Sequence, residues 1–391
     1  MKIMTAMYTL KKGGAYDRFI MMVEALLEKG CHVHCLSLTP ILIQHPSYTN
    51  HVVALPFRIR NAVVTRAMVL SLFPFYLLFM GWREKIDLIV AFGPLYAFLQ
   101  ALPKWILKKP MVTLIRSDLS SRTRTSSPRP WTAFLSKRID RIGILSSDRI
   151  ITNNVATQEE IIRVVGYRKK DQVTVLYNNI PSIARPSQET LSLERSRLGI
   201  PNDGKLMVTT GVVTPGKNFE VLLRCLLGPG MTNLFLAIVG DGTTKADFLY
   251  RDQLKELAGE LDIPQRVVFT GWVQKEELWR IDSAADLFIL PSTNEGMPNA
   301  LLEALGCNTP CFGSNIPGIR DILCHDELMF DPYDEGALIQ KVVRFFADGV
   351  YARKISKLCL EQKEKLCFDW KGWVVERVTE GAGCIEAAEK R

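Results

Sequence analysis

Apolar and polar positions along the first 40 residues predict a strand, a helix and a second strand. Residues 2–10 form a strand-like run, and residues 31–38 alternate in the same way. Between them, residues 11–30 carry apolar side chains at helical spacing, and Gly30 is well placed to end that helix. The apolar positions are Phe19, Met22, Val23, Leu26 and Leu27. This order is typical of a parallel α/β sheet.

The same alternation continues through the rest of the chain. The first half holds three more short apolar segments that read as buried strands, 86–93, 110–118 and 147–154. A second series supplies strands at 205–211, 233–242, 266–273, 285–292 and 309–314, with helices at 218–227, 245–261, 275–284 and 298–306. The polar, proline-containing segment 173–190 lies between the two series, and we expect an interdomain linker there. The tail 367–391 begins with an aromatic-rich helical pattern that could cross back onto the first half.

Composition is that of an ordinary globular protein with two cores. The chain has 391 residues, of which 47% are hydrophobic and 23% charged. Its nine cysteines are scattered without a CxxC pair or a histidine cluster, so we expect buried thiols of a cytoplasmic protein and no zinc site. The opening apolar run breaks at "KKGG", and we therefore expect no signal peptide.

Charge is unevenly divided between the two halves. Residues 1–190 hold 26 Lys and Arg against 12 Asp and Glu, a net charge of +14, and the remainder holds 23 against 29, a net charge of −6. The basic half either faces an anionic partner, such as a nucleic acid or a membrane surface, or is a generic basic surface.

Two apolar stretches within residues 60–110 bear on that choice. Residues 67–82 carry no charge and are bounded by Arg66 and Arg83, but sixteen residues are short for a bilayer span and Pro74 is expected to break the middle. Residues 94–110 form a second apolar and aromatic stretch with a basic end. Such segments either lie on an anionic membrane, here the inner face of the plasma membrane, or form core-facing helices.

The most informative segment is "PSTNEGMPNALLEALG", residues 291–306, which follows an expected strand. Ligands of open parallel sheets bind beyond the carboxyl ends of the strands, where this segment begins. Pro298 suits a first helical turn, and Glu303 lies roughly 7.5 Å further along the helix axis. Glu295 and Glu303 are therefore candidates to accept hydrogen bonds from different hydroxyls of one long ligand. The alternative is a capping acid and a solvent-facing helical acid.

Three more loops follow expected strands of the same series. They contain Lys217 in "TGVVTPGKN", Gly240 and Gly242 in "VGDG", and Trp272 in "TGW". Because the carboxyl ends of parallel strands share one edge, all four loops should converge, which favours a nucleotide-like ligand.

These motifs resemble the family-4 retaining glycosyltransferases of GT-B fold. The resemblance covers most of residues 205–335 and is looser in the first half, through "KKGGAYDRF", "SDRIITNNVATQEEI" and "VLYNNI". It implies an α/β protein with two Rossmann-like parallel-sheet domains that face across a cleft. Residues 1–183, with 366–391 packing back on them, would form the acceptor-side domain, and residues 184–365 the nucleotide-sugar domain.

The resemblance also implies roles for individual residues. Glu295 would contact the donor sugar, Glu303 would hold the ribose hydroxyls and Lys217 would neutralise the diphosphate. Asp118, near the place where many members have a histidine, would contact sugar or acceptor, unless it is a simple loop aspartate. The remaining expected donor-binding residues are Gly13, Gly14, Gly211, Asn218, Gly240, Gly242, Trp272, Asn294, Gly296, Met297, Pro298, Asn299 and Leu302.

One residue departs from the family pattern. Members usually have an arginine directly after the glycine that Gly211 matches, and this chain has Val212. Loss of one such contact would cost on the order of 3 kcal/mol of transition-state stabilisation. Either another base compensates, with Arg320, Arg116 and Arg18 as candidates, or activity is weak or absent.

We therefore predict sugar transfer from a nucleoside-diphosphate sugar, such as a UDP-sugar, to a glycan or lipid-linked acceptor, as in bacterial surface polysaccharide or lipopolysaccharide synthesis. The chain contains no Asp-x-Asp triad, so we expect no metal and no cofactor for this reaction. The alternative is a non-catalytic nucleotide-sugar-binding or regulatory protein. A dehydrogenase would need a G-x-G-x-x-G turn after the first strand, and no nucleic-acid-binding motif accompanies the basic residues.

Overall fold

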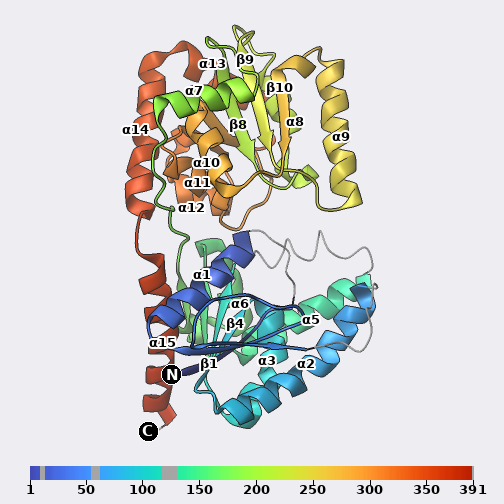
Figure 1. Ribbon diagram of the computed structural model, residues 1–391, viewed down its shortest axis with the longest axis vertical. Coiled ribbons are helices and arrows are strands. Elements are labelled where there is room, and N and C mark those ends of the chain that lie inside the picture. Colours follow the sequence, from blue (N-terminus) through green and yellow to red (C-terminus); the bar gives the residue numbers. More distant parts are fainter. Residues whose placement is uncertain (9–13, 54–61, 117–129, 390–391) are drawn as a thin grey trace. The chain divides into compact units, whose positions relative to one another are not determined.

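The computed structural model describes residues 1–8, 14–53, 62–116 and 130–389. The chain divides into two compact units (Figure 1). Unit 1 comprises Met1–Tyr177 together with Asp369–Arg391, and unit 2 comprises Asn178–Phe368.

Unit 1 is built on a seven-stranded parallel sheet. Its strand order is β3-β2-β1-β4-β5-β6-β7. The strands are β1 (Lys2–Ala6), β2 (His32–Ser37), β3 (Tyr48–Val52), β4 (Leu88–Phe92), β5 (Met111–Ile115), β6 (Arg149–Thr152) and β7 (Val173–Val175). The helices are α1 (Gly14–Glu28), α2 (Ala62–Glu84), α3 (Pro94–Leu107), α5 (Pro130–Ser146), α6 (Val155–Val165) and α15 (Trp370–Glu389).

Helix α2 differs from the expectation that Pro74 would break its apolar stretch. Pro74 lies inside the helix, which continues to Glu84. The neighbouring side chains Phe73 and Leu77 are almost fully buried, so packing holds the helix together despite the lost backbone hydrogen bond. Among the described residues, no helix is long and apolar enough to cross a membrane.

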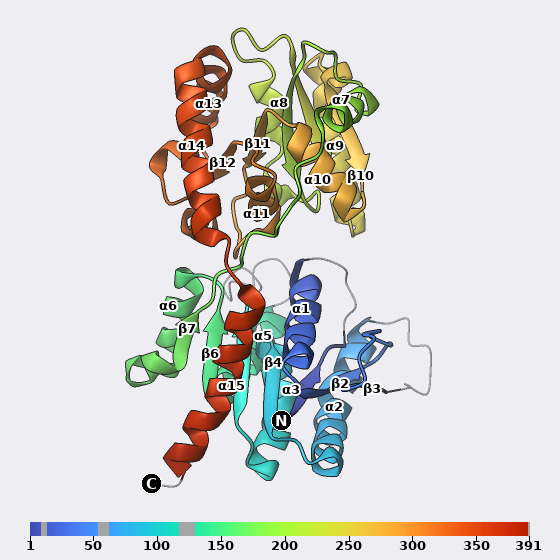
Figure 2. The same cartoon turned by 60° about the vertical axis from the view of Figure 1, so that its left-hand side comes forward.

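Helix α15 completes unit 1 although it follows unit 2 in the chain (Figure 2). It packs against α1, and Lys371 Nζ lies 2.6 Å from a carboxylate oxygen of Glu28. Trp370, at its start, is 1% exposed and is the largest fully buried side chain of the described residues.

Unit 2 is a six-stranded parallel sheet of order β10-β9-β8-β11-β12-β13. The strands are β8 (Lys205–Thr210), β9 (Leu234–Val239), β10 (Val267–Gly271), β11 (Leu287–Leu290), β12 (Cys311–Ser314) and β13 (Met329–Phe330). The helices are α7 (Gln188–Arg197), α8 (Glu220–Cys225), α9 (Lys245–Glu260), α10 (Lys275–Ala284), α11 (Asn299–Gly306), α12 (Pro317–Leu323), α13 (Glu335–Ala347) and α14 (Gly349–Leu366). The alternation predicted from residue 205 onward is confirmed.

The expectation of buried cysteines holds for six of the eight whose environment is described. It is wrong for Cys324 and Cys367, which are exposed. Both directly follow a helix, at the ends of α12 and α14, where the chain turns at the surface.

The carboxyl ends of β8 and β9 approach each other closely. Gly240, which follows β9, has a φ of 128°, and a Cβ atom there would lie 2.0 Å from the carbonyl oxygen of Gly211. The Gly240 amide also donates to the Gly271 carbonyl at the end of β10, at 3.0 Å. Only glycine permits this contact, which draws the three strand ends together.

A carboxyl group is buried in the interior of unit 2. Asp282, on α10, is fully buried, and neither carboxyl oxygen has a hydrogen-bond partner. Burial raises the pKa of Asp282 well above its usual range, and the negative charge of Glu303 raises it further. A buried carboxyl without a partner is stable only in its neutral form.

We expect Asp282 to make stability fall as pH rises. In the unfolded chain Asp282 ionises near pH 4, whereas in the folded chain it keeps its proton to a higher pH. Between these values the unfolded state binds fewer protons, so the free energy of unfolding decreases by up to about 1.4 kcal/mol per pH unit. Asp282→Asn should remove this slope in urea denaturation between about pH 5 and 8. The exposed Asp252→Asn should keep it, and equal slopes in wild type and Asp282→Asn would contradict a neutral buried carboxyl.

Candidate functional site

The strand order of unit 2 reverses between β8 and β11, which are neighbours in the sheet but not in sequence. Strand β8 leads into the loop that ends at Lys217, and β11 leads into the loop that contains Glu295. The two loops are tied together, because the amide and the hydroxyl of Thr293 donate to the Gly216 carbonyl at 2.9 and 3.2 Å. Such a reversal point is where open α/β sheets bind ligands.

An ion pair joins the two loops at this point. Lys217 Nζ contacts Glu295 Oε1, and the Ser292 hydroxyl donates to the same oxygen at 2.9 Å. The side chains of Lys217 and Glu295 are only 19% and 15% exposed. A Cβ atom on Gly211 would lie 3.4 Å from Lys217 Nζ, so the glycine leaves room for the lysine. A cation and an acceptor are thus held side by side at the sheet edge.

Helix α11 begins beside this pair. Pro298 occupies the position just before the helix, one residue earlier than a first-turn proline, and no side chain caps it. The expected ligand residues around Pro298 differ in their exposure to solvent. Asn294 is exposed, whereas the side chains of Met297 and Leu302 are buried in the core of unit 2. Met297 and Leu302 can therefore serve a ligand only through backbone groups or by shaping the wall.

The second glutamate lies one turn into α11 and contacts a different base. Lys275 Nζ is 3.5 Å from Glu303 Oε1, and the Glu303 side chain is 15% exposed. Lys275 also lies over the ring of Trp279, 5.4 Å from its centroid. Lys275, like Ser292, was not among the residues expected from the sequence. Its place at the start of an expected helix, directly after the "TGW" loop, was the available signal.

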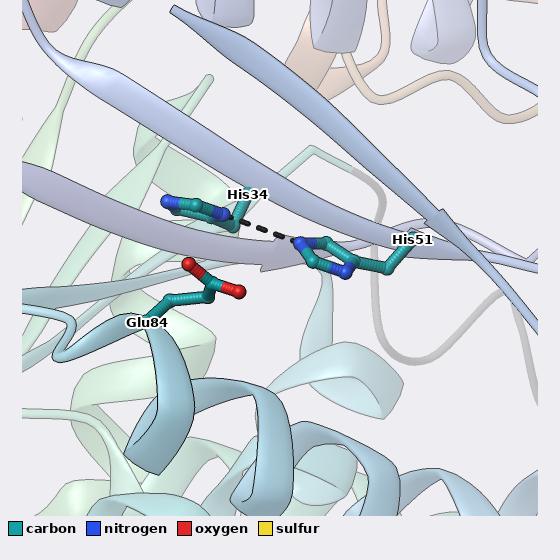
Figure 3. A group of neighbouring side chains, drawn as sticks. All are labelled: His34, His51 and Glu84. Atoms are coloured by element: carbon teal, nitrogen blue, oxygen red, sulfur yellow. Dashed lines mark hydrogen bonds between the residues drawn. The ribbon is translucent and has the colours of Figure 1, made fainter.

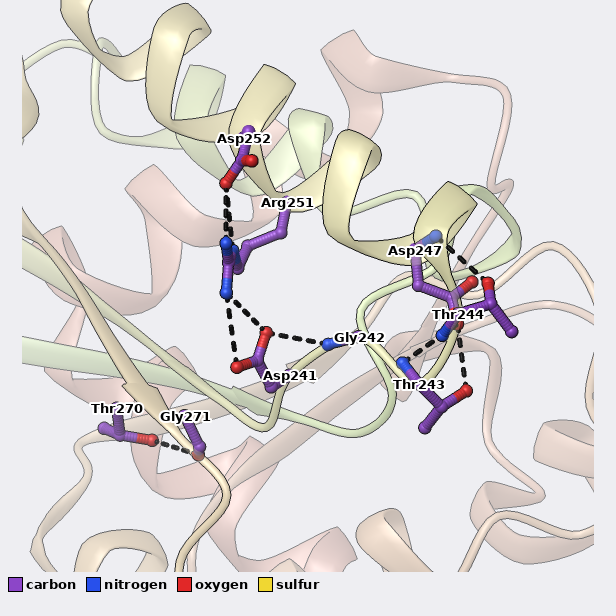
Figure 4. Close-up of polar contacts among 9 residues, drawn as sticks. All are labelled: Asp241, Gly242, Thr243, Thr244, Asp247, Arg251, Asp252, Thr270 and Gly271. Atoms are coloured by element: carbon purple, nitrogen blue, oxygen red, sulfur yellow. Dashed lines mark hydrogen bonds and ion pairs between the residues drawn. The ribbon is translucent and has the colours of Figure 1, made fainter.

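The loop between β9 and α9 is occupied by its own hydrogen bonds (Figure 4). Asp241 pairs with Arg251 at 3.0 Å and accepts from the Gly242 amide at 2.8 Å. The amides of Thr243 and Thr244 both donate to Asp247, in a capping box at the start of α9. The N-terminus of α9 is therefore already satisfied by a carboxylate, whereas that of α11 has no side-chain cap.

The other expected donor-binding residues of unit 2 lie in the same loops. Asn299 is the first residue of α11, and its side chain accepts from Asn178 at 3.0 Å. Asn218 has a left-handed φ of 55°, and its side-chain amide donates to the Pro332 carbonyl at 3.0 Å. Trp272 directly follows β10 and is 59% exposed. Gly296 packs against α12, where a Cβ atom on Gly318 would lie 1.9 Å from the Gly296 carbonyl oxygen.

Of the three candidate compensating arginines, one belongs to unit 2 and two belong to unit 1. Arg320, in unit 2, is exposed and donates to Asn315 at 2.9 Å. Arg18 and Arg116, in unit 1, both lie over the Trp370 ring, at 5.2 and 5.9 Å from its centroid. Burial lowers the pKa of Arg116 to about 9, and the charge of Arg18 adds to the effect.

Three residues of unit 1 were expected at the site: Gly13, Gly14 and Asp118. Gly14 is exposed and is the first residue of α1. Gly13 and Asp118 lie outside the described residues.

Comparison with known proteins covers both units. The profile described as Glycosyl transferases group 1 matches residues 192–359, and that of Glycosyltransferase Family 4 matches residues 12–181. An uncharacterized glycosyltransferase of Methanocaldococcus jannaschii is 28% identical over 62% of this chain. The aligned region spans 61% of that relative's length. The lipopolysaccharide core biosynthesis glycosyltransferase LpsE of Rhizobium meliloti is 24% identical over 89% of both chains.

Solved structures share the fold. HepE of Anabaena, in complex with UDP-glucose, superposes with a TM-score of 0.77 at 18% identity, covering 99% of this chain and 100% of the other. The two parallel sheets with flanking helices agree with that fold. Profiles over both units and the shared architecture together establish that this chain belongs to the family-4 glycosyltransferases of GT-B fold.

Proposed function

We propose that this chain is a retaining glycosyltransferase that moves a sugar from a UDP-sugar to a hydroxyl of a glycan or lipid-linked acceptor. The observation that carries the proposal is the Lys217–Glu295 pair at the strand-order reversal of unit 2. The UDP-glucose complex of Anabaena HepE supports the donor class, and the lipopolysaccharide core relative supports the acceptor class. Unit 2 would be the donor side and unit 1 the acceptor side.

Donor binding would separate the ion pair. The ammonium of Lys217 would turn to the diphosphate, whose charge it neutralises, and the Glu295 carboxylate would accept hydrogen bonds from sugar hydroxyls. The uncapped start of α11 would add backbone donors for the phosphates. The Glu303 carboxylate would leave its contact with Lys275 and accept hydrogen bonds from the ribose hydroxyls. The two loops that carry Lys217 and Glu295 are already tied together at the edge, so side-chain movements alone would be needed.

The transfer step needs no group beyond donor, acceptor and these side chains. The bond from the anomeric carbon to the diphosphate oxygen breaks while the acceptor oxygen bonds to the same carbon on the same face. The acceptor proton passes to the departing diphosphate. We propose no metal and no cofactor for this step, with Lys217 stabilising the developing charge.

We expect Lys217→Ala and Glu295→Gln to lower turnover by about 10²- to 10³-fold, because each removes a group that stabilises the transition state. A thermal-shift screen with UDP-, GDP- and ADP-sugars would first identify the donor, and release of the nucleotide would then measure turnover. The exposed pair Lys354 and Glu327 provides the matched controls Lys354→Ala and Glu327→Gln, which should stay near wild type. Near-wild-type rates in both site variants would refute this assignment.

Val212 favours a second candidate, a nucleotide-sugar-binding protein without transfer activity. If the site is catalytic but lacks one cation, Val212→Arg should raise turnover by about 10-fold or more, since Val212 is only partly buried and lies beside the Lys217 loop. Val212→Leu, which adds volume without charge, should not. The alternative outcome is that wild type and Val212→Arg both bind the donor but release no nucleotide, with or without an added extract of glycans and lipid-linked glycans. That outcome would support the non-catalytic function.

The acceptor side carries a surface suited to an anionic bilayer, which we propose as its partner. Phe75, Phe79 and Trp82 share one face of α2, are 57–69% exposed, and leave the opposite face to the core. The ends of α2 and α3 meet, since a Cβ atom on Gly81 would lie 2.7 Å from Leu107. Trp105 and Ile106, next to Leu107 in the last turn of α3, are also exposed. Basic residues lie in the last turn of α2 or just beyond the two helices: Arg83, Lys85, Lys108 and Lys109. Aromatic side chains beside basic ones are typical of interfacial binding.

We expect the protein to sediment with vesicles that contain phosphatidylglycerol and to be released by salt, because screening weakens attraction to anionic lipid. Phe75→Ser with Trp82→Ser should reduce the bound fraction several-fold. Leu193→Ser, at a 70% exposed position of unit 2, is the matched control. Equal sedimentation with phosphatidylcholine vesicles at low salt would exclude this surface as an anionic-lipid site.

A further inference from the structure

Three side chains that play no part in the proposed transfer converge in unit 1 (Figure 3). His34 comes from β2, His51 from the edge strand β3, and Glu84 is the last residue of α2. In the β2–β3 register His51 lies opposite Leu36, two residues beyond His34, so both imidazoles project from the same face of the sheet. Figure 3 shows the Glu84 carboxylate pointing toward both rings.

Their spacing matches a metal coordination sphere. His34 Nδ1 and His51 Nε2 are 3.2 Å apart. One ring nitrogen of each histidine and one carboxylate oxygen of Glu84 lie within 4.8 Å of one another. Ligands of a tetrahedral Zn²⁺ ion are separated by roughly 3.3 Å, given metal–ligand bonds of about 2.0–2.1 Å. The two nitrogens already have that separation, and the carboxylate needs only a small movement.

The protonation states also suit a cation. Burial lowers the pKa of His34 and of His51, although Glu84 acts in the opposite direction, so both imidazoles favour the neutral form that binds metals. Cys35 is the neighbouring residue on β2, but its side chain projects from the opposite face. The donor set on this face is therefore two nitrogens and one oxygen.

A cavity gives access to two of these side chains, His51 and Glu84. It has a volume of about 450 Å³, and its wall includes His51, Arg83 and Glu84 together with apolar residues of β2, β3 and α2. Two histidines, one glutamate and an open position are a ligand set that proteins use for Zn²⁺. We propose that His34, His51 and Glu84 bind one Zn²⁺ ion per chain, with the remaining coordination position open to this cavity. The ion would join the edge strand β3 to β2 and to the end of α2.

The competing explanation is a metal-free hydrogen bond between the two histidines. That bond requires one ring nitrogen to donate to the other, with the carboxylate beside it. Arg83 Nε lies 3.6 Å from a Glu84 oxygen and is exposed, so it could hold the carboxylate without a metal. The two explanations differ in whether the chain takes up a metal ion.

The test uses the full chain without an affinity tag, stripped with chelator and dialysed. Titration with Co²⁺ should give visible absorption that saturates at one ion per chain and disappears on addition of Zn²⁺. Zn²⁺ should raise the melting temperature. His34→Gln, His51→Gln and Glu84→Gln should each weaken Zn²⁺ binding by more than the roughly 10- to 100-fold that loss of an outer-shell partner costs.

His32→Gln is the matched control, since His32 is exposed on the same strand. It should bind as wild type does. Glu84→Gln leaves the histidine pair intact, so it remains informative if a histidine variant fails to fold. Failure of wild type to take up Co²⁺ or Zn²⁺, binding that persists in all three ligand variants, or equal loss in His32→Gln would overturn the proposal.

Discussion

The ion pair between Lys217 and Glu295 connects the two loops that leave the sheet of unit 2 where its strand order reverses. Both side chains are largely withdrawn from water, and the desolvation of two charges offsets much of their attraction. Such a pair is therefore a weak source of stability. It is better understood as a set of ligand groups held in place, with Ser292 and Gly211 fixing the positions of the acid and the base.

The starts of helices α9 and α11, at the same edge, differ in how well each could bind an anion. The amides of Thr243 and Thr244, just before α9, donate to the Asp247 carboxylate, which already places negative charge at that helix end. Helix α11 starts without a side-chain cap and close to a cation. A second anion would be repelled at the first position and attracted at the second. Asp247 near the start of α9 and Lys217 near the start of α11 thus make the two helix ends differ in their suitability for an anion.

Much of unit 2 could be predicted because buried parallel strands read as short apolar runs between amphipathic helices. The meeting of Lys217 and Glu295 followed from topology, since both leave carboxyl ends of strands. The contact of Lys275 with Glu303 depends on how α10 packs against α11, and no spacing rule carries that information.

The failures have local physical reasons. Strand β3, "YTNHV", is a half-exposed edge strand, so it lacks the apolar run that marks a central one. Asp282 looks like an ordinary helical acid, and only packing shows that it is buried. In α2 apolar residues form both a buried face and an exposed aromatic face, and the run of apolar letters in residues 67–82 does not distinguish the two.

The position of α15 has a consequence for biosynthesis. Residues 1–177 leave the ribosome first, yet Trp370, which fills a fully buried place among them, is translated only after all of unit 2. Unit 2 is contiguous in the chain and can fold as soon as it emerges. The earlier-made unit lacks its last helix until unit 2 has been made, so the order of synthesis and the order of completed folding are reversed.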